Sequence, residues 1–247
     1  MPQVGIREGS ATINYVFYPE GFFSRVIPVA VVDSVADTNG HVVTKLIEPG
    51  IAWQGRAGMS GEVDYNAHDQ ERAGPNLLHD ERWHFNLGLN PPGLISSISL
   101  DGHLGKSIDF IGDRAGHGGD FTFSATARPT RHLQLDANLA GQWLRSGGRR
   151  LFRAQAERLK ATYVFTRTTF VRVIGQYLRS DFDPALYSVS VPRTSGSLQS
   201  SALFGYQVNW QSVLYFGYGD TRVLSENAQL LRAGRQLFLK ISYAFQR

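Results

Sequence analysis

The chain of 247 residues contains no cysteine, which excludes disulfide cross-links and metal sites built on thiolates. Charged residues are scarce, since they make up 19% of the chain, against about 25% in typical soluble domains. Long apolar runs are missing too. A membrane-spanning helix needs about 20 consecutive apolar residues, and the strongest short stretch, 26–32, is interrupted by Pro28. These absences exclude a helical membrane protein but are compatible with strands that cross a membrane.

Two further features are absent. The formal net charge is +4, but no basic run is longer than Arg149-Arg150, so nucleic acid is not expected as a partner. Residues 1–7 lack the charged segment followed by an apolar core that marks a signal peptide. An exported barrel with this N-terminus is therefore expected to be a mature chain, a mis-started chain or a fragment of a longer protein.

What the sequence does have is a repeated alternation of apolar and polar residues. Between residues 132 and 143, every second side chain is apolar or small: Leu133, Leu135, Ala137, Leu139, Gly141 and Trp143. The same alternation returns over 51–65 and 236–245. Because successive side chains of a strand point to opposite faces, each such strand has one apolar and one polar face. The repetition predicts an all-β fold, a transmembrane antiparallel up-and-down β-barrel.

Turn signals divide the chain into about 13 to 14 strands. Tight breaks are expected at 19–21, 48–50, 90–93, 128–131, 166–168 and 209–211, and looser ones at 37–40, 67–82, 112–119, 144–149, 180–196 and 221–235. The two kinds alternate, as periplasmic turns and extracellular loops do in outer-membrane barrels. The expected strands are 10–19, 24–36, 41–48, 50–66, 82–89, 93–110, 120–128, 131–143, 150–165, 168–180, 197–209, 212–220 and 235–246.

The number of expected strands is odd, so the first and last would run in the same direction. Bacterial single-chain barrels normally have an even number of antiparallel strands. We therefore expect at least one upstream strand, outside this chain, to complete the barrel. Residues 1–247 are accordingly expected to form a single outer-membrane β-barrel domain that is the C-terminal part of a longer protein.

The chain from residue 121 onward also carries a family resemblance. It rests on turn and strand motifs at 127–133 (ARPTRHL), 163–166 (YVFT), 207–220 (QVNWQSVLYFGYGD) and 236–245 (QLFLKISYAF). These motifs resemble the C-terminal barrel of an uncharacterised bacterial outer-membrane family, whose full-length members carry a carbohydrate-binding family 9-like domain before the barrel. The resemblance implies a barrel in the bacterial outer membrane and a periplasmic domain, outside this chain, as a partner. Since the motifs are structural, it implies no activity.

Local motifs give little support for catalysis or metal binding. Residues 102–107 (GHLGKS) end like a phosphate-binding loop but lack its first glycine and continue a strand. Residues 79–84 (HDERWH) contain two histidines that share no face, so a solvated loop end is the simpler interpretation. Residues 116–120 (GHGGD) indicate a flexible outer loop, with an ion site at His117 and Asp120 as the alternative. We therefore predict no catalytic residue, cofactor or metal.

Charged residues on the polar faces form the most credible functional set. They fall opposite apolar strand positions, so we expect the following to line the lumen: Arg56, Glu62, Asp64, Asp136, Arg158, Lys160, Arg172 and Lys240. They either pair with one another within the wall or face a water-filled pore. On the other face, lipid is expected to contact Leu135, Leu139, Leu239 and Ile241. Membrane interfaces are expected at Trp53, Trp83, Trp143, Tyr163, Tyr177, Tyr218 and Tyr243.

The sequence is compatible with two classes of function. The first is a non-catalytic barrel of the bacterial outer membrane that acts as a pore, a conduit or a membrane anchor, with outer-membrane lipid as its partner. The second is a barrel-borne hydrolase acting on lipid or carbohydrate, which needs a nucleophile beside a base that no local motif supplies. A soluble β-sandwich binding protein is the structural alternative, because it too would bury apolar strand faces. The alternation favours the first class.

Overall fold

The computed structural model describes residues 5–73 and 76–243, apart from the side chains of 67–69 and 71–73. These ranges form the strands β1 (Ile6–Asn14), β2 (Phe23–Asp37), β3 (Val42–Gly55), β4 (Ser60–Ala73), β5 (Asn76–His79), β6 (Arg82–Leu89), β7 (Ile95–Asp109), β8 (Arg114–Ala127), β9 (Leu133–Ser146), β10 (Arg149–Thr166), β11 (Thr169–Phe182), β12 (Thr194–Gln207), β13 (Ser212–Leu224) and β14 (Leu230–Tyr243). Two short 3-10 helices are η1 (Arg56–Gly58) and η2 (Pro184–Leu186). Within these ranges, no helix has both the length and the apolar character that a membrane span requires.

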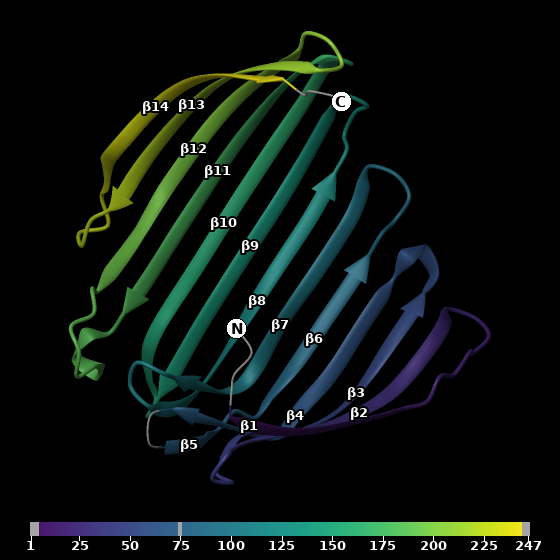
Figure 1. Cartoon of the computed structure of the whole chain (residues 1–247), viewed down its shortest axis with the longest axis vertical. Helices are drawn as coiled ribbons and strands as arrows, with labels where there is room; N and C mark the ends of the chain where they lie inside the picture. The colour runs from purple at the N-terminus through teal and green to yellow at the C-terminus, as the bar shows by residue number, and fades with distance from the viewer. Residues whose placement is uncertain (1–4, 74–75, 244–247) are drawn as a thin grey trace.

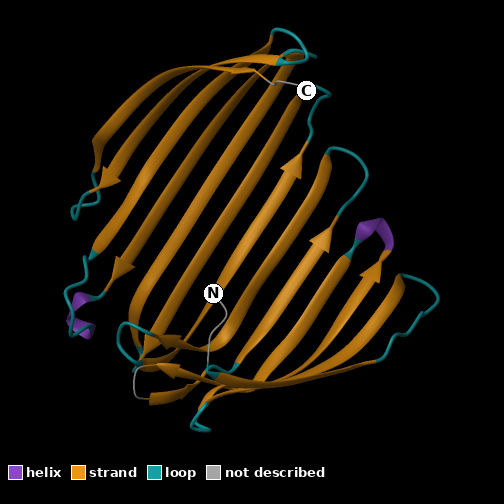
Figure 2. Ribbon diagram, in the orientation of Figure 1, coloured by secondary structure: helices purple, strands orange, loops and turns teal. Residues whose placement is uncertain are grey.

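All the strands belong to one antiparallel sheet (Figure 1). Its order follows the chain from β1 to β14, except that β5 pairs only with β4 and lies off the path. Turns and loops occur at the two ends of the strands, as Figure 2 shows. The two-residue turn between β9 and β10 contains Gly147 and Gly148 with φ of 57° and 76°, the left-handed conformation that such hairpin turns favour. This topology confirms the predicted up-and-down antiparallel arrangement.

The edges of the sheet are β1 and β14, and over the described residues no hydrogen-bonded ladder joins them. They lie at opposite ends of the curved sheet in Figure 1. Apart from β5, the path contains an odd number of strands, so both edge strands run in the same direction. The odd count is therefore confirmed and the sheet is open. That an upstream strand fills the gap stays a prediction.

The turn expected at 48–50 is wrong, because these residues lie inside β3. The chain reverses instead at 56–59, where the Gly55 N–H donates to the Met59 carbonyl oxygen at 2.8 Å. Gly50 serves a different purpose: a Cβ atom there would lie 2.7 Å from the Cβ of Asp64. Gly50 thus allows β4 to approach β3 closely. A glycine that serves this purpose inside a strand looks the same in the sequence as a glycine that marks a turn.

Several loops expected on the opposite side are shorter than predicted. Strands extend into the expected loops 67–82 and 221–235, and two further cases involve glycine-rich or neighbouring segments. Residues 116–119 belong to β8, and residues 144–146 belong to β9. A side chain at Gly118 would collide with the carbonyl oxygen of Trp143. The glycines of 116–119 therefore let β8 and β9 pair closely, and the flexible outer loop predicted there is wrong.

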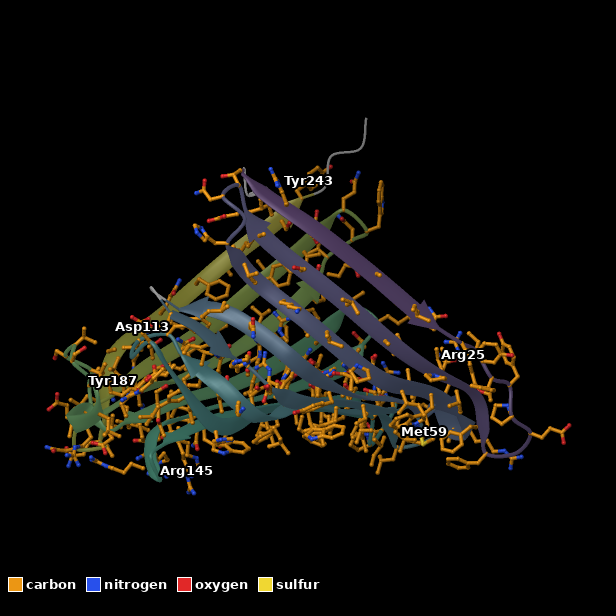
Figure 3. All side chains as sticks on the ribbon, turned by 90° about the horizontal axis from the view of Figure 1, so that it is seen from below. Arg25, Met59, Asp113, Arg145, Tyr187 and Tyr243 are labelled. Atoms are coloured by element: carbon orange, nitrogen blue, oxygen red, sulfur yellow. The ribbon has the colours of Figure 1, made fainter. Side chains whose placement is uncertain are left out.

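The pairing register assigns each strand position to one of two faces, because cross-strand partners share a face. An apolar row crosses six strands through Leu133, Tyr163, Val171, Phe204, Phe216 and Leu239. A polar row crosses the other face through Asp64, His84, His103, Asp120 and Gln142. Figure 3 shows the sheet bent into a trough, with nitrogen and oxygen atoms gathered inside it. The predicted two-faced sheet is thus confirmed along these strands, from β4 to β14.

Candidate functional site

The polar face of the sheet is the candidate site, and it holds seven of the eight predicted lumen residues. The strand register pairs Asp136 of β9 with Lys160 of β10. It also pairs Arg172 of β11 with Thr162, which lies two residues beyond Lys160 and therefore on the same face. By the same register, the shared face also carries Glu62, Asp64, Arg158 and Lys240. Arg56 is the exception, since it lies in the turn helix η1 rather than in a strand. Its placement on a strand face was wrong because the turn falls at 56–59 instead of 48–50.

Ion pairs between residues of the polar face neutralise only part of its charge. Lys160 Nζ lies 3.1 Å from Asp136 Oδ2, and the Thr126 hydroxyl donates to Asp136 Oδ1 at 3.0 Å. Over the described residues, no ion pair involves Glu62, Arg158, Arg172 or Lys240. Unpaired charges on a sheet face need solvent, because burying them without a partner is costly. The polar face therefore has the character of a wetted wall.

A histidine–carboxylate cluster occupies the same face and was missed by sequence reasoning. His84 Nδ1 lies 2.7 Å from Asp64 Oδ2, and its Nε2 lies 3.2 Å from Asp101 Oδ2. His103 Nδ1 lies 3.0 Å from Asp120 Oδ1. The two imidazole rings stack, with centroids 4.7 Å apart. The cluster spans β4, β6, β7 and β8, so it joins residues whose association only the register reveals.

The cluster corrects two sequence interpretations. His84 lies in β6 on the polar face and is not part of a solvated loop end. Asp120 pairs with His103, whereas His117 lies three residues away in β8 on the opposite face, so the alternative ion site at His117 and Asp120 is not formed. Where the structure describes the side chains, no group of three histidine or carboxylate residues is placed to hold a metal ion.

Charge is distributed unevenly over the polar face. Its β3–β8 part carries an acidic wall, which we define as Glu48, Glu62, Asp64, Asp101 and Asp120. Its β10–β11 part carries the basic residues Arg158, Lys160 and Arg172. Water between two such walls would experience a field directed from the basic to the acidic side.

The loop 183–193 packs against β8 and β10 at one end of the trough. It begins where the Asp183 N–H donates to the Leu151 carbonyl oxygen at 2.9 Å, and Arg149 pairs with Asp183 at 2.8 Å. Its Tyr187 ring lies under the guanidinium of Arg114, 5.1 Å from the ring centroid. Burial raises the pKa of the Tyr187 phenol above its ordinary value. Tyr187, Asp113 and Arg145 mark this end in Figure 3, opposite Met59 and Arg25.

Comparison with known proteins identifies the fold. No protein-family model and no curated protein sequence matches the chain. The structure is similar to the outer membrane channel DcaP of Acinetobacter baumannii, with a TM-score of 0.55, 12% identity, and coverage of 98% of this chain and 96% of that one. An anion-selective porin from Comamonas acidovorans aligns with a TM-score of 0.48 and 11% identity over 96% of this chain and 89% of that one.

The chain therefore has the fold class of outer-membrane β-barrels, an all-β antiparallel up-and-down sheet, here open between β1 and β14. The resemblance to the uncharacterised outer-membrane family, and the treatment of residues 1–247 as one domain, stay predictions.

Proposed function

We propose that the protein forms a water-filled, non-catalytic pore in the bacterial outer membrane. The observation that carries this proposal is the separation of faces: exposed apolar side chains cover one face, and polar and charged side chains, several of them without an ion pair, cover the other. Lipid would contact the first face and water the second, which is the pattern of a transmembrane barrel. The fold shared with an outer membrane channel supports the same proposal.

The geometry supports a hydrolase less well. Such an enzyme needs a hydroxyl nucleophile within reach of a base. The histidines of the polar wall instead face carboxylates: His84 meets Asp64 and Asp101, and His103 meets Asp120. His132 faces the Val164 carbonyl oxygen. We therefore propose that the charged residues of the polar face interact with passing solutes and do not cleave bonds.

Conductance measurements test the pore directly. Protein extracted from outer membranes with detergent and added to a planar lipid bilayer is expected to give discrete conductance steps. A preparation that inserts without producing steps would contradict the pore and leave the role of a membrane anchor.

Ion selectivity should follow the two charged walls. Neutralising the acidic wall with Glu62→Gln, Asp101→Asn and Asp120→Asn is expected to lower the cation-to-anion permeability ratio by roughly two- to tenfold, because fixed charges concentrate counter-ions near them. The opposite variant, Arg158→Gln with Arg172→Gln, should raise the ratio. Reversal potentials in a salt gradient measure both. Shifts in the same direction, or none in either variant, would show that these residues do not line the conducting path.

A further inference from the structure

Three arginines gather on the apolar face near the β9–β10 turn. Arg145 lies in β9, and Arg150 and Arg153 lie in β10. Register pairs Arg145 with Arg150 and Trp143 with Arg153, which places all of them on the face of Trp143. Residues 150 and 153 share this face because the register shifts between Arg150 and Phe152, and such a bulge re-aims the side chains that follow it.

The arginines border a cavity of about 420 Å³ on the apolar face. Its floor is formed by Phe121, Leu139 and Trp143. Gly141 has no side chain, and the ring of Phe121 occupies the space where a Cβ atom would lie. The cavity therefore combines a cationic rim near the end of the strands with an apolar floor towards their middle.

The rim carries a net positive charge. Arg145, Arg150 and Arg153 are exposed, and over the described residues none of them forms an ion pair. Nearby carboxylates are already engaged, since Asp183 pairs with Arg149 and Asp181 pairs with Arg179 at 2.9 Å. Among the residues that line the cavity, one is acidic: Glu157, which lies four residues beyond Arg153 in β10 and on the same face.

The position of the rim indicates which anion fits it. Arginine facing lipid costs about 2–4 kcal/mol at the bilayer midplane but about 0–1 kcal/mol near an interface, so three outward arginines belong at headgroup depth. Guanidinium groups bind phosphate with paired, charge-assisted hydrogen bonds. A phosphate-bearing lipid fits both parts of the cavity, because its phosphate can bind the arginines and its acyl chain can contact Phe121 and Leu139.

We propose that this cavity binds one phosphate-bearing membrane lipid, with the phosphate held by Arg145, Arg150 and Arg153 and an acyl chain lying over Phe121 and Leu139. The inference rests on the proposed membrane location but not on conduction. The lipid would be a fixed neighbour of the barrel wall, outside the lumen.

Native mass spectrometry of the full chain in neutral detergent micelles tests the site with three probes: dimyristoyl phosphatidic acid, dimyristoylglycerol and inorganic phosphate. Phosphatidic acid is expected to be retained with a stoichiometry of one. The same chains without phosphate, and phosphate without chains, should bind at least about tenfold more weakly, because each supplies only part of the contacts. Equal retention of dimyristoylglycerol, or equal binding of inorganic phosphate, would overturn the proposal.

Substitutions distinguish binding at this site from a general attraction of phosphatidic acid to the positive charge of the protein. Arg145→Gln with Arg153→Gln should weaken phosphatidic acid binding by about tenfold or more. The matched control, Arg131→Gln with Arg167→Gln, removes the same charge from exposed turns at the opposite end and should leave binding unchanged. Equal losses in both variants would contradict the site. If the unsubstituted protein conducts but does not retain phosphatidic acid, this inference alone is refuted. If it retains phosphatidic acid but does not conduct, the pore alone is refuted.

Discussion

Arginine at position 202 is expected to destabilise the protein in a bilayer by about 2–4 kcal/mol, whereas arginine at position 201 should cost much less. Ala202 and Ser201 are adjacent, small and exposed residues of β12, so neither substitution removes packing. Ala202 shares the apolar face with Val173 and Tyr218, and Ser201 shares the polar face with Ile174 and Gly219. The pair therefore differs mainly in the medium that each side chain meets.

Urea titration of the two variants in lipid vesicles measures this difference. Ala202→Arg should move the unfolding midpoint to a clearly lower urea concentration, and Ser201→Arg should remain close to the unsubstituted protein. Equal shifts would mean that both faces meet the same medium and would refute the assignment of faces.

Leu151→Ala is expected to lower the free energy of unfolding by about 2–5 kcal/mol, the range for emptying a buried leucine site. Leu151 is 1% exposed, which makes it the most buried apolar side chain among the described residues; Ile108, Leu144 and Leu224 are the other buried ones. Its carbonyl oxygen also accepts the Asp183 N–H at the start of the 183–193 loop. Loss of its side chain should therefore loosen this end of the trough as well.

The same substitution at Leu159 supplies the control. Leu159 lies in the same strand but is 62% exposed on the apolar face, where lipid can fill the space left by the removed atoms. Denaturation of both variants in micelles should show a much smaller loss for Leu159→Ala. A Leu159→Ala loss as large as that of Leu151→Ala would mean that protein, rather than lipid, packs against the apolar face.

Alternation alone was sufficient to predict the two faces. Leu135, Leu139, Leu239 and Ile241 all lie on the apolar face and are exposed, between 36% and 72%. The expected aromatic residues occur on this face too, as the pairing of Trp143 with Gly119 and of Tyr163 with Leu133 shows. A period of two is a local property of the chain, so one sequence reveals it.

Glycine was the main source of error. Gly50 and Gly118 indicated a turn and a loop in the sequence, but each permits the close approach of a neighbouring strand. A turn and a close approach both require a missing side chain, so the residue type alone cannot distinguish them. The neighbouring strand decides between them, and it is known only from the register.

The histidine–carboxylate cluster was missed for a related reason. Asp64 and His84 are 20 positions apart in the chain, and His103 and Asp120 are 17 apart. Each was visible as a polar residue at an alternating position, but their contacts depend on how far neighbouring strands are shifted. A one-residue change in register would move every one of these side chains to the other face.

The central claim, that water fills one side of the sheet and lipid covers the other, is tested most directly by spin labels along β9. The chain has no cysteine, so residues 134–139 can be replaced singly by cysteine and labelled in membranes without background. Positions 134, 136 and 138 should collide with a water-soluble nickel chelate, and positions 135, 137 and 139 with oxygen dissolved in lipid. An absence of alternation, or odd positions shielded from both reagents as in a soluble sandwich, would contradict the account.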